Sequence, residues 1–320
     1  MFTARSFHEY KKADKRIVMC TAYDVWQGRL AAAAGIDAIL VGDSMGTTTL
    51  GLDSTLGVSV DDIARATAAV VAGAGSEAFV VADMPFMSYQ VSFEEGMRNA
   101  GRLVAQSGAA AVKVEGASPD TLTLVEGLTA AGIPVVGHLG LTPQSWRALG
   151  GYRVQAKELP DILDLLVATH LLMEAGICAL VLECVPSEVA RQITEIFDVA
   201  TIGIGAGPFC DGEVQVLHDL LGLGGEFTPR HAQRLVNLED IALQALETYV
   251  SGVRKNTFPD EAQTVHIKRE LVEEASAAFV QHIFETFDDD DDDEEDDDYG
   301  DGNSPPTPPP FLGGFGAHRN

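Results

Sequence analysis

Phe79-Val80-Val81-Ala82-Asp83 is an apolar run that ends on a carboxylate, and four other stretches of the chain have the same form. Strands that are buried on both faces read as continuous apolar runs, a pattern typical of parallel sheets. The other four runs are Ala38-Ile39-Leu40-Val41-Gly42-Asp43, Ala111-Val112-Lys113-Val114-Glu115, Val135-Val136-Gly137-His138 and Leu180-Val181-Leu182-Glu183. Parallel α/β folds build their active sites at the carboxyl ends of their strands. Five polar strand ends therefore predict an enzyme with its site at that end of the sheet.

Strand and helix patterns alternate along most of the chain, as expected for parallel β/α architecture. Strands are expected at residues 16–22, 37–41, 78–82, 110–114, 133–137, 179–182 and 200–204, with an eighth near 215–217. Helices are expected at 25–34, 60–72, 92–105, 120–131, 161–175 and 187–197, most of them ending near a glycine. A closed (β/α)8 TIM barrel is favoured over a doubly wound open sheet, because no GxGxxG motif follows the first strand.

The far end of the chain differs in composition from the rest. Residues 260–287 are expected to form an amphipathic helical extension, with Leu271, Val272, Ala275, Phe279 and Ile283 at helical spacing. Residues 288–298 are an unbroken acidic run, which a proline-rich and then a glycine-rich stretch follows. Such a segment buries too little apolar area to offset its ordering entropy, so a disordered tail is expected over 288–320. The barrel domain is then expected over residues 1–259.

Charge and hydropathy exclude two classes of partner. The net charge is −27, and without residues 288–320 the chain still carries 36 acids against 20 bases. This surface should repel nucleic acid and anionic membranes. No apolar run approaches the roughly 18 residues that a membrane span needs, and residues 1–16 are polar and charged. A cytoplasmic protein is therefore expected. The four cysteines form no CxxC pair and are interpreted as buried apolar residues rather than disulfides or metal ligands.

Three carboxylates at successive strand ends suggest a metal site. Asp43, Asp83 and Glu115 should converge at the barrel mouth, where they repel one another unless a cation binds. Hard oxygen ligands of this number suit Mg²⁺, and the absence of Cys and His from the set disfavours zinc. The alternative is that each carboxylate is a separate solvated group at the start of a loop.

The remaining polar strand ends allow more than one interpretation. Lys113 lies two residues before Glu115 and so shares its face, where it could pair with a substrate carboxylate or with a neighbouring acid. His138 could be a general acid, a ligand or a structural group. Glu183 is placed to act as a general base or acid, or to form a structural salt bridge. Residues 203–207 are glycine-rich, which suits either anion binding or a tight turn.

The strand-end motifs resemble the ketopantoate hydroxymethyltransferase family. The resemblance runs in order from about residue 21 to residue 259, and Gly137-His138-Leu139-Gly140-Leu141-Thr142-Pro143-Gln144 is its most specific string. The other matching strings are Val41-Gly42-Asp43-Ser44-Met45-Gly46, Asp83-Met84-Pro85-Phe86-Met87, Val112-Lys113-Val114-Glu115-Gly116, Leu182-Glu183-Cys184-Val185-Pro186 and residues 203–207. One departure is Gln155-Ala156-Lys157, where family members often have Gln-Gly-Arg or Gln-Gly-Lys.

The resemblance implies a fold, a reaction and a set of site residues. The family is a (β/α)8 barrel that transfers a hydroxymethyl group from 5,10-methylenetetrahydrofolate to 3-methyl-2-oxobutanoate, commonly as a homodecamer. Its Mg²⁺ ligands match Asp43, Asp83 and Glu115, and its proton acceptor matches Glu183. Its substrate-binding positions match Asp43, Ser44, Asp83, Lys113 and His138, the exact role of His138 being left open.

Two other functions remain open from the sequence. One is a related Mg²⁺-dependent barrel of the phosphoenolpyruvate mutase and isocitrate lyase type, which acts on 2-oxo acids without folate; the Lys-Lys-Cys-Gly-His string expected of isocitrate lyases is absent here. The other is an inactive scaffold whose acidic tail recruits a basic partner.

Overall fold

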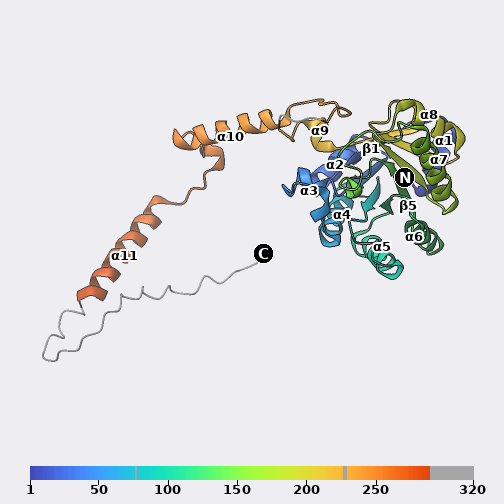
Figure 1. Cartoon of the computed structure of the whole chain (residues 1–320). Helices are drawn as coiled ribbons and strands as arrows, with labels where there is room; N and C mark the ends of the chain where they lie inside the picture. The colour runs from blue at the N-terminus through green and yellow to red at the C-terminus, as the bar shows by residue number, and fades with distance from the viewer. Residues whose placement is uncertain (76–77, 226–228, 289–320) are drawn as a thin grey trace, which may run out of the picture. The chain divides into compact units, whose positions relative to one another are not determined.

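The computed structural model describes residues 1–75, 78–225 and 229–288, and eight parallel strands among them close into a barrel in chain order (Figure 1). They are β1 (Ile17–Thr21), β2 (Ala38–Val41), β3 (Phe79–Asp83), β4 (Ala111–Glu115), β5 (Val135–Gly140), β6 (Ala179–Glu183), β7 (Ala200–Ile204) and β8 (Gly212–Gln215). The predicted (β/α)8 barrel is confirmed. The eighth strand precedes its expected place because Leu217 begins a helix, and only Val214 of β8 packs in the apolar barrel interior.

Helices follow the strands on the outside of the barrel (Figure 1). They are α2 (Val25–Ala33), α3 (Met45–Thr48), α4 (Val60–Ala74), α5 (Phe93–Ser107), α6 (Pro119–Ala130), α7 (Leu159–Glu174), α8 (Ser187–Ile196) and α9 (Leu217–Leu221), with α1 (Ala4–Lys12) before β1. Short 3-10 turns, η1 (Thr55–Gly57) and η2 (Pro143–Ser145), lie in two of the loops. Ser59 and Ser92 begin α4 and α5 by accepting hydrogen bonds from Asp62 and Glu95 backbone N–H groups.

One glycine has a different role from the one expected. The helix expected over residues 60–72 should end near Gly73, but α4 continues to Ala74 and the following Gly75 takes the left-handed φ of 62°. A Cβ on Gly73 would lie 2.1 Å from Val25 O, and one on Gly28 would lie 2.6 Å from Val70 O. These two glycines therefore allow α2 and α4 to pack backbone against backbone.

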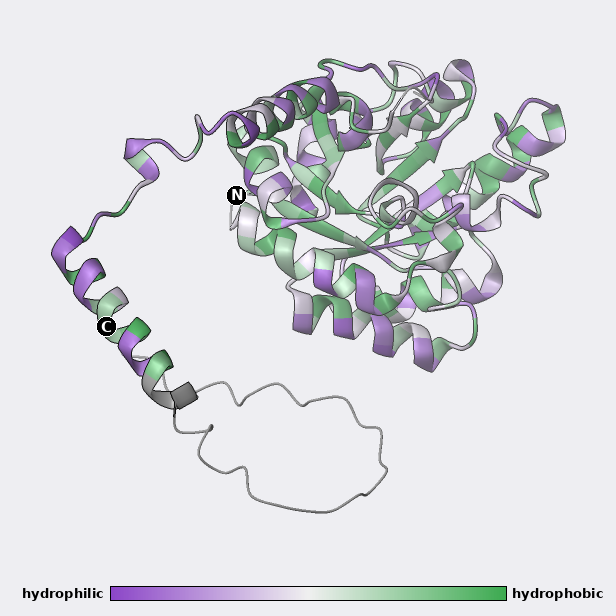
Figure 2. Cartoon of the chain, turned by 90° about the vertical axis from the view of Figure 1, so that its left-hand side faces the viewer, coloured by the Kyte–Doolittle hydropathy of each residue, from purple (hydrophilic) through white to green (hydrophobic). Residues whose placement is uncertain are grey.

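Two apolar layers form the core of the barrel unit. The inner layer fills the barrel with alternate residues of the strands, such as Ile17, Leu40, Val81 and Ile202. The outer layer lies between the strands and the helices, and Figure 2 shows the apolar strands surrounded by helices with hydrophilic outward faces. Because side chains alternate along a strand, every second residue of a strand belongs to the inner layer.

The chain divides into two compact units, residues 1–248 and residues 249–320. Helix α10 (Leu238–Arg254), which was not expected from the sequence, contains the boundary and has no buried residue. In the second unit the structure describes η3 (Glu261–Gln263) and α11 (Arg269–Asp288). The acidic run from residue 289 onward, expected to be disordered, lies outside the described residues.

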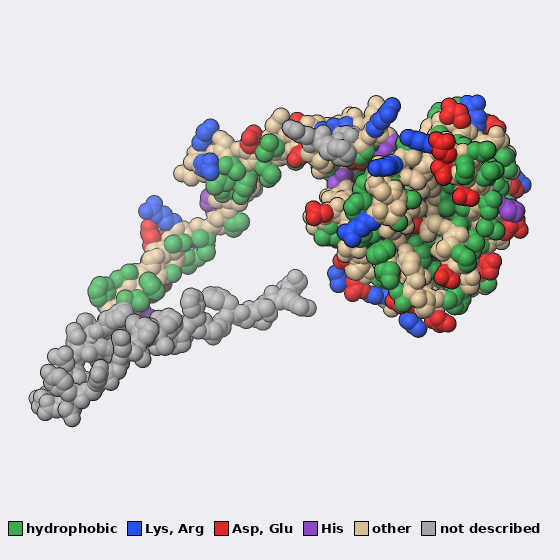
Figure 3. All heavy atoms as spheres, viewed as in Figure 1, with side chains coloured by type: hydrophobic (Ala, Val, Ile, Leu, Met, Phe, Trp, Pro, Cys, Tyr) green, Lys and Arg blue, Asp and Glu red, His purple; other side chains and the backbone are tan. Residues whose placement is uncertain are grey.

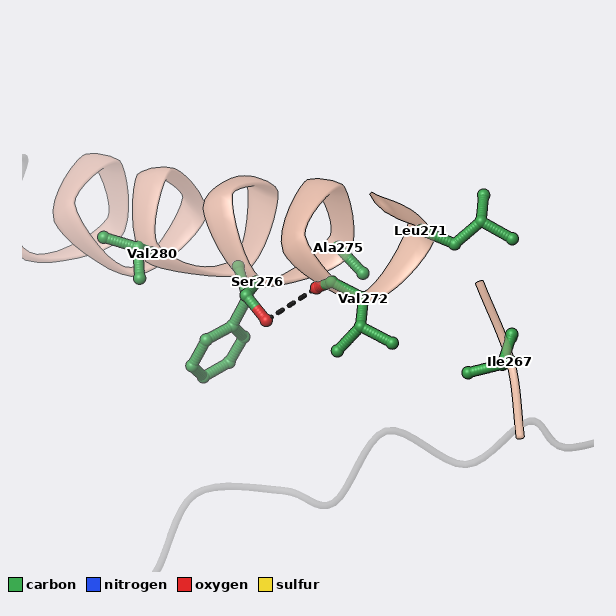
Figure 4. A pocket seen from close by; sticks show the side chains of 7 residues that line it. Ile267, Leu271, Val272, Ala275, Ser276 and Val280 are labelled. Atoms are coloured by element: carbon green, nitrogen blue, oxygen red, sulfur yellow. Dashed lines mark hydrogen bonds between the residues drawn. The ribbon is translucent and has the colours of Figure 1, made fainter. Parts of the chain in front are cut away.

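The helical extension begins later than expected. The helix was expected from residue 260, but the Asp260 side chain accepts a hydrogen bond from Ala262 N and caps the separate turn η3, after which Thr264 is extended. Helix α11 carries the predicted apolar face, whose side chains are exposed (Figure 3). A hollow is lined by Ile267 together with four residues of this face, Leu271, Val272, Ala275 and Phe279 (Figure 4). No helix in the described parts of the chain is long and apolar enough to cross a membrane.

Candidate active site

The inner face of the barrel leads directly into the candidate site. Val81, Ala111, Val136 and Val181 pack in the apolar interior, and the residues two positions further along the same strands are polar. These residues are Asp83, Lys113, His138 and Glu183, with Glu115 two further along β4. The strand register pairs Asp83 with Lys113 and Glu115 with His138. Four of the five predicted strand-end groups, those of β3 to β6, therefore share one face with Lys113, as the alternation of strand side chains requires.

Asp43 joins this cluster from the turn that follows β2. Its backbone N–H donates to Asp83 Oδ2 at 2.8 Å, and its side chain is buried. A Cβ on the preceding Gly42 would lie 3.2 Å from Asp83 Oδ2, so a larger residue there would crowd this carboxylate. The next residue, Ser44, is partly buried, and its Oγ lies 2.8 Å from the hydroxyl of Tyr23, which was not expected from the sequence to belong to the site.

Lys113 is the buried cation of the cluster. Its Nζ lies 2.7 Å from Asp83 Oδ1 and 4.0 Å from Glu115 Oε1. The contact with Asp83 is an ion pair at close range but not a hydrogen bond of good geometry, because Oδ1 has no well-aligned donor. Burial alone would lower the pKa of Lys113, but the carboxylates of Asp83, Glu115 and Asp43 outweigh burial and raise it. Lys113 is therefore a fixed positive charge inside the barrel mouth.

His138 connects the cluster to Glu183. Its Nδ1 lies 3.4 Å from Glu115 Oε1 and 3.3 Å from Lys113 Nζ, and its Nε2 lies 3.2 Å from Glu183 Oε2. Burial and the charge of Lys113 lower the pKa of His138, but its contacts with Glu115 and Glu183 outweigh them and raise the pKa to about 9. In this arrangement the protonated ring faces a carboxylate on each side, and only the neutral ring could accept a hydrogen bond from Lys113.

The carboxylates differ in how strongly the site opposes their ionisation. Burial, together with the charges of Asp83 and Glu115, raises the pKa of Asp43 well above its usual value. Burial also raises the pKa of Asp83, although Lys113 opposes the rise. For Glu115, burial is outweighed by His138 and Lys113, so its pKa is lowered. Asp43 is therefore the acid that most needs an added cation or donor to remain charged.

Gln144 and Tyr89 complete the cluster, and neither was selected as a site residue from the sequence. The Gln144 amide donates to Asp43 Oδ2 at 3.2 Å and to Met84 O at 3.0 Å, while its backbone N–H donates to Glu115 Oε2 at 3.0 Å. The hydroxyl of Tyr89 accepts from Glu115 N at 3.0 Å and lies 3.3 Å from Gln144 Oε1. Gln144 is thus one residue that contacts two of the predicted metal ligands. The sequence offered one indication that Gln144 belongs to the site, because Gln144 is the last residue of the Gly-His-Leu-Gly-Leu-Thr-Pro-Gln string.

The chemical type of these side chains suits a hard divalent cation, because such cations prefer carboxylate oxygens as ligands. Asp43, Asp83 and Glu115 are buried carboxylates of one cluster, and Asp83 Oδ1 and Glu115 Oε1 form ion pairs with Lys113 and His138 but accept no well-aligned hydrogen bond. Among the described residues, no three Asp, Glu, His or Cys side chains are already gathered around one coordination point. Gln144 holds Asp43 and Glu115, and Lys113 holds Asp83. The metal assignment of these three residues stays a prediction.

The glycine-rich stretch after β7 is explained by close packing at two positions. A Cβ on Gly207 would lie 2.3 Å from Ser187 Oγ, and one on Gly203 would lie 3.0 Å from Glu213 Oε2. Gly205 and Gly207 take φ of 67° and 78°. These contacts favour the tight-turn interpretation of residues 203–207 over an anion site.

The four cysteines are free thiols. Cys20 and Cys210 are buried, which agrees with the expected apolar role, while Cys178 and Cys184 are partly exposed. Burial raises the pKa of Cys20 to about 12 and that of Cys184 to about 11. Raised values do not favour the thiolate that a nucleophile or metal ligand requires.

The fold and the site together define the class of protein. Carboxylates, a lysine and a histidine are buried where the parallel strands end, which is where barrels of this kind carry out catalysis. The chain is therefore a (β/α)8-barrel enzyme with an acidic site in the barrel mouth.

Comparisons with known proteins identify the family. The family model described as ketopantoate hydroxymethyltransferase matches residues 1–261. A protein of Geobacillus sp. (strain WCH70) named 3-methyl-2-oxobutanoate hydroxymethyltransferase is 47% identical over 270 residues, which cover 84% of this chain and 96% of that protein. A protein of the same name from Pseudothermotoga lettingae is 49% identical over 250 residues, covering 78% and 94% of the two chains. The chain belongs to the ketopantoate hydroxymethyltransferase family.

Solved structures share the fold at low sequence identity. Phosphoenolpyruvate phosphomutase from Streptomyces platensis subsp. rosaceus aligns with a TM-score of 0.55 and 14% identity over 88% of this chain and 98% of that chain. Phosphonopyruvate hydrolase in complex with oxalate and Mg²⁺ aligns with a TM-score of 0.55 and 11% identity over 89% and 99%. These likenesses support the barrel fold alone.

Proposed function

We propose that this chain transfers a hydroxymethyl group from 5,10-methylenetetrahydrofolate to 3-methyl-2-oxobutanoate, giving 2-dehydropantoate for pantothenate and coenzyme A synthesis. The observation that carries the proposal is the family match over residues 1–261, because that range contains the whole buried cluster. The chain also spans 96% of a relative that bears the name of this activity.

The proposed reaction balances without an oxidant or reductant. A base removes the hydrogen on C3 of the 2-oxo acid, and the electron pair moves toward the C2 carbonyl oxygen. C3 then bonds to the one-carbon unit while the carbon–nitrogen bonds to folate break. Water supplies the new hydroxyl, and the two released folate nitrogens take one proton from water and one from C3. The products are 2-dehydropantoate and tetrahydrofolate.

Each residue of the cluster has a proposed role. Glu183 is proposed as the base, since its side chain is 16% exposed against 2–3% for Asp83 and Glu115. His138 Nε2, 3.2 Å from Glu183 Oε2, orients this carboxylate. Lys113 is proposed to bind the substrate carboxylate. Ser44, Asp43 and Asp83 are carried over from the family as substrate contacts.

The metal proposal rests on the donor set. Asp43, Asp83 and Glu115 are proposed to hold one Mg²⁺ per subunit, because three buried carboxylates exceed the charge that Lys113 and protonated His138 can neutralise. Such an ion supplies a Lewis acid that withdraws electrons from the 2-oxo group. Calorimetric titration with Mg²⁺ in the absence of substrate tests this point separately from activity.

Glu183→Gln tests the proposed base. The amide is nearly isosteric and cannot accept the C3 proton, so exchange of that hydrogen with deuterated solvent should fall by about 10²–10⁴ while 2-oxo-acid binding persists. Glu188→Gln, the same change at an exposed position of α8, is the matched control and should exchange as the wild type does. Wild-type exchange in Glu183→Gln would remove Glu183 from this role.

Omitting the folate co-substrate tests the main alternative. A lyase or mutase of the phosphoenolpyruvate mutase type would convert a 2-oxo acid without folate. The proposed enzyme should form 2-dehydropantoate only when methylenetetrahydrofolate is present, as chromatography of the products would measure. Formation of another product at the same rate without folate would contradict the proposal.

A homodecamer is proposed from the family resemblance. Light scattering coupled to size-exclusion chromatography should then give a mass near ten times the 34.0 kDa of one chain. A monomer at micromolar concentration would contradict it. The cytoplasmic location also stays a prediction.

A further inference from the structure

An aromatic pair lies on the loop between η2 and α7. The rings of Trp146 and Tyr152 stack with their centroids 5.7 Å apart and their planes 5° from parallel. Gly150 and Gly151 turn the chain back between them with φ of 72° and 114°, and Gly151 N donates to Trp146 O at 2.8 Å. This turn fixes the spacing of the two rings.

Both ends of this loop are bonded to the candidate active site. At its start, Gln144 N donates to Glu115 Oε2 at 3.0 Å. At its end, Gln155 N donates to Cys184 O at 2.9 Å, directly after Glu183. Partial burial and then the charges of Asp43, Glu183 and Glu115 raise the pKa of Tyr152. The loop thus joins two strand ends of the site, and Tyr152 is within electrostatic reach of its carboxylates.

Of the two stacked rings, that of Tyr152 is exposed to solvent. The Arg147 guanidinium lies over the Trp146 ring, 5.5 Å from its centroid, and Trp146 lies against Tyr152. Trp146 is half-buried, whereas Tyr152 is 59% exposed. The Trp146 Nε1 atom is buried without a hydrogen-bond acceptor among the described residues. An exposed tyrosine backed by a second ring is a surface on which a planar molecule could stack.

The charge of the loop is opposite to that of the molecule. Residues 146–158 contain Arg147, Arg153 and Lys157 and one acidic residue, Glu158, so the loop is net positive in a chain with a net charge of −27. All three cations are exposed. A ligand that suits this loop is therefore planar, aromatic and anionic.

We propose that Trp146 and Tyr152 form the stacking platform for the ring system of the folate co-substrate, with the loop cations facing its glutamate carboxylates. The inference rests on the proposed function, because that reaction requires a planar one-carbon donor beside the 2-oxo acid. The pterin and aminobenzoyl groups are planar, and the glutamate supplies the negative charge. Because Gln144 and Gln155 bond this loop beside Glu115 and Glu183, the proposed donor would lie near these strand ends.

Tyr152→Ala tests the platform with tetrahydrofolate as the probe. Stacking of a base on an aromatic side chain is worth about 1–3 kcal/mol, so the Kd for tetrahydrofolate by calorimetry should rise about 5- to 150-fold. Tyr152→Phe keeps the ring and should stay close to the wild-type Kd. Tyr249→Ala removes a tyrosine that is 55% exposed in α10 and should bind tetrahydrofolate as the wild type does.

Fluorescence provides an independent readout, because the chain has two tryptophans. In a Trp26→Phe background, Trp146 is the remaining one, and tetrahydrofolate should quench its emission in proportion to the calorimetric saturation. Exchange of the C3 hydrogen of 3-methyl-2-oxobutanoate needs no folate, so measurable exchange in Tyr152→Ala shows that the remaining site is folded.

The outcomes separate the two proposals. If the wild type binds tetrahydrofolate and Tyr152→Ala binds it equally well, the platform is refuted and the proposed function stands. Lack of tetrahydrofolate binding by the wild type would refute both. A higher Kd in Tyr152→Ala, with rescue by Tyr152→Phe and a Trp146 signal, supports the platform.

Discussion

Gln144→Met should weaken metal binding without disrupting the barrel. Methionine is close to glutamine in length, but it removes the amide donor that reaches Asp43 Oδ2 at 3.2 Å and Met84 O at 3.0 Å. The Gln144 backbone bond to Glu115 Oε2 is kept, so the change isolates the side chain. In the variant, Asp43 would lose the hydrogen bond from the Gln144 side chain, which counteracts the rise in its pKa that burial causes.

The expected magnitude follows from two separate considerations. A hydrogen bond to a charged group is worth about 1.5–3 kcal/mol. Loss of a residue that orients a metal ligand typically costs 10- to 100-fold in metal affinity, about 1.4–2.8 kcal/mol. The two ranges agree, so the Kd for Mg²⁺ should rise roughly 10- to 100-fold.

The pH dependence gives a sharper test. The bond from Gln144 lowers the pKa of Asp43 against the larger effect of burial, so its loss raises that pKa further. Metal binds the deprotonated carboxylate. The ratio of variant to wild-type Kd should therefore be largest at low pH and decrease as the pH rises.

Calorimetric Mg²⁺ titration of the substrate-free protein provides the measurement, with thermal unfolding as the check on folding. Gln90→Ala is the matched control, because exposed Gln90 donates to Gln144 Oε1 and has no bond to Asp43. A surface change is usually worth less than about 0.5 kcal/mol, so the control should stay within about threefold of wild type. An unchanged Kd in a folded Gln144→Met would show that Gln144 does not support the metal site.

Three further predictions concern other parts of the chain. Asp83→Ala should lower Mg²⁺ affinity more than any change in the acidic tail, because it removes a proposed ligand; unchanged affinity by calorimetry would remove Asp83 from the metal site. Deletion of residues 288–320 should leave specific activity near wild type at matched salt and oligomer size, since screening at about 0.15 M salt limits the reach of its charges to about 8 Å; a loss of more than tenfold would contradict this. With a pKa of about 11, only about one Cys184 side chain in a thousand should be a thiolate at pH 8. The thiol reagent DTNB should therefore react slowly with the folded chain and rapidly after unfolding. Fast labelling of the folded protein would oppose a structural role for the thiols.

The barrel could be predicted because its strands are buried on both faces. Apolar runs such as Phe79–Asp83 and Ala111–Glu115 leave few alternatives to parallel strands. Strand β8 was harder to place, because Glu213 and Gln215 face outward and only Val214 packs inside. A glycine such as Gly73 predicts a helix end, because sequence alone does not show that another helix packs directly against it.

The candidate site was predictable to the extent that it follows strand alternation. Lys113 and Glu115 share a face because they are two residues apart on β4, and the structure places them with Asp83, His138 and Glu183 as expected. The contribution of Gln144 depends on contacts between the loop after β5 and two other strand ends. Neither residue type nor spacing reveals those contacts.

The charged upper part of the barrel interior has a consequence for protein engineering. Barrels of this type usually fill that position with branched apolar side chains, and replacing buried ion pairs by well-packed apolar residues is often neutral or stabilising. The barrel therefore has a lower free energy of unfolding with Asp83, Lys113 and Glu115 than with apolar residues in their place. The proposed chemistry requires these charged groups, so the lower stability accompanies the function. Screening variants for heat resistance alone would select against the active site. Stabilising substitutions should instead be sought in the lower interior layers and between the helices and the sheet, where side chains have no catalytic task.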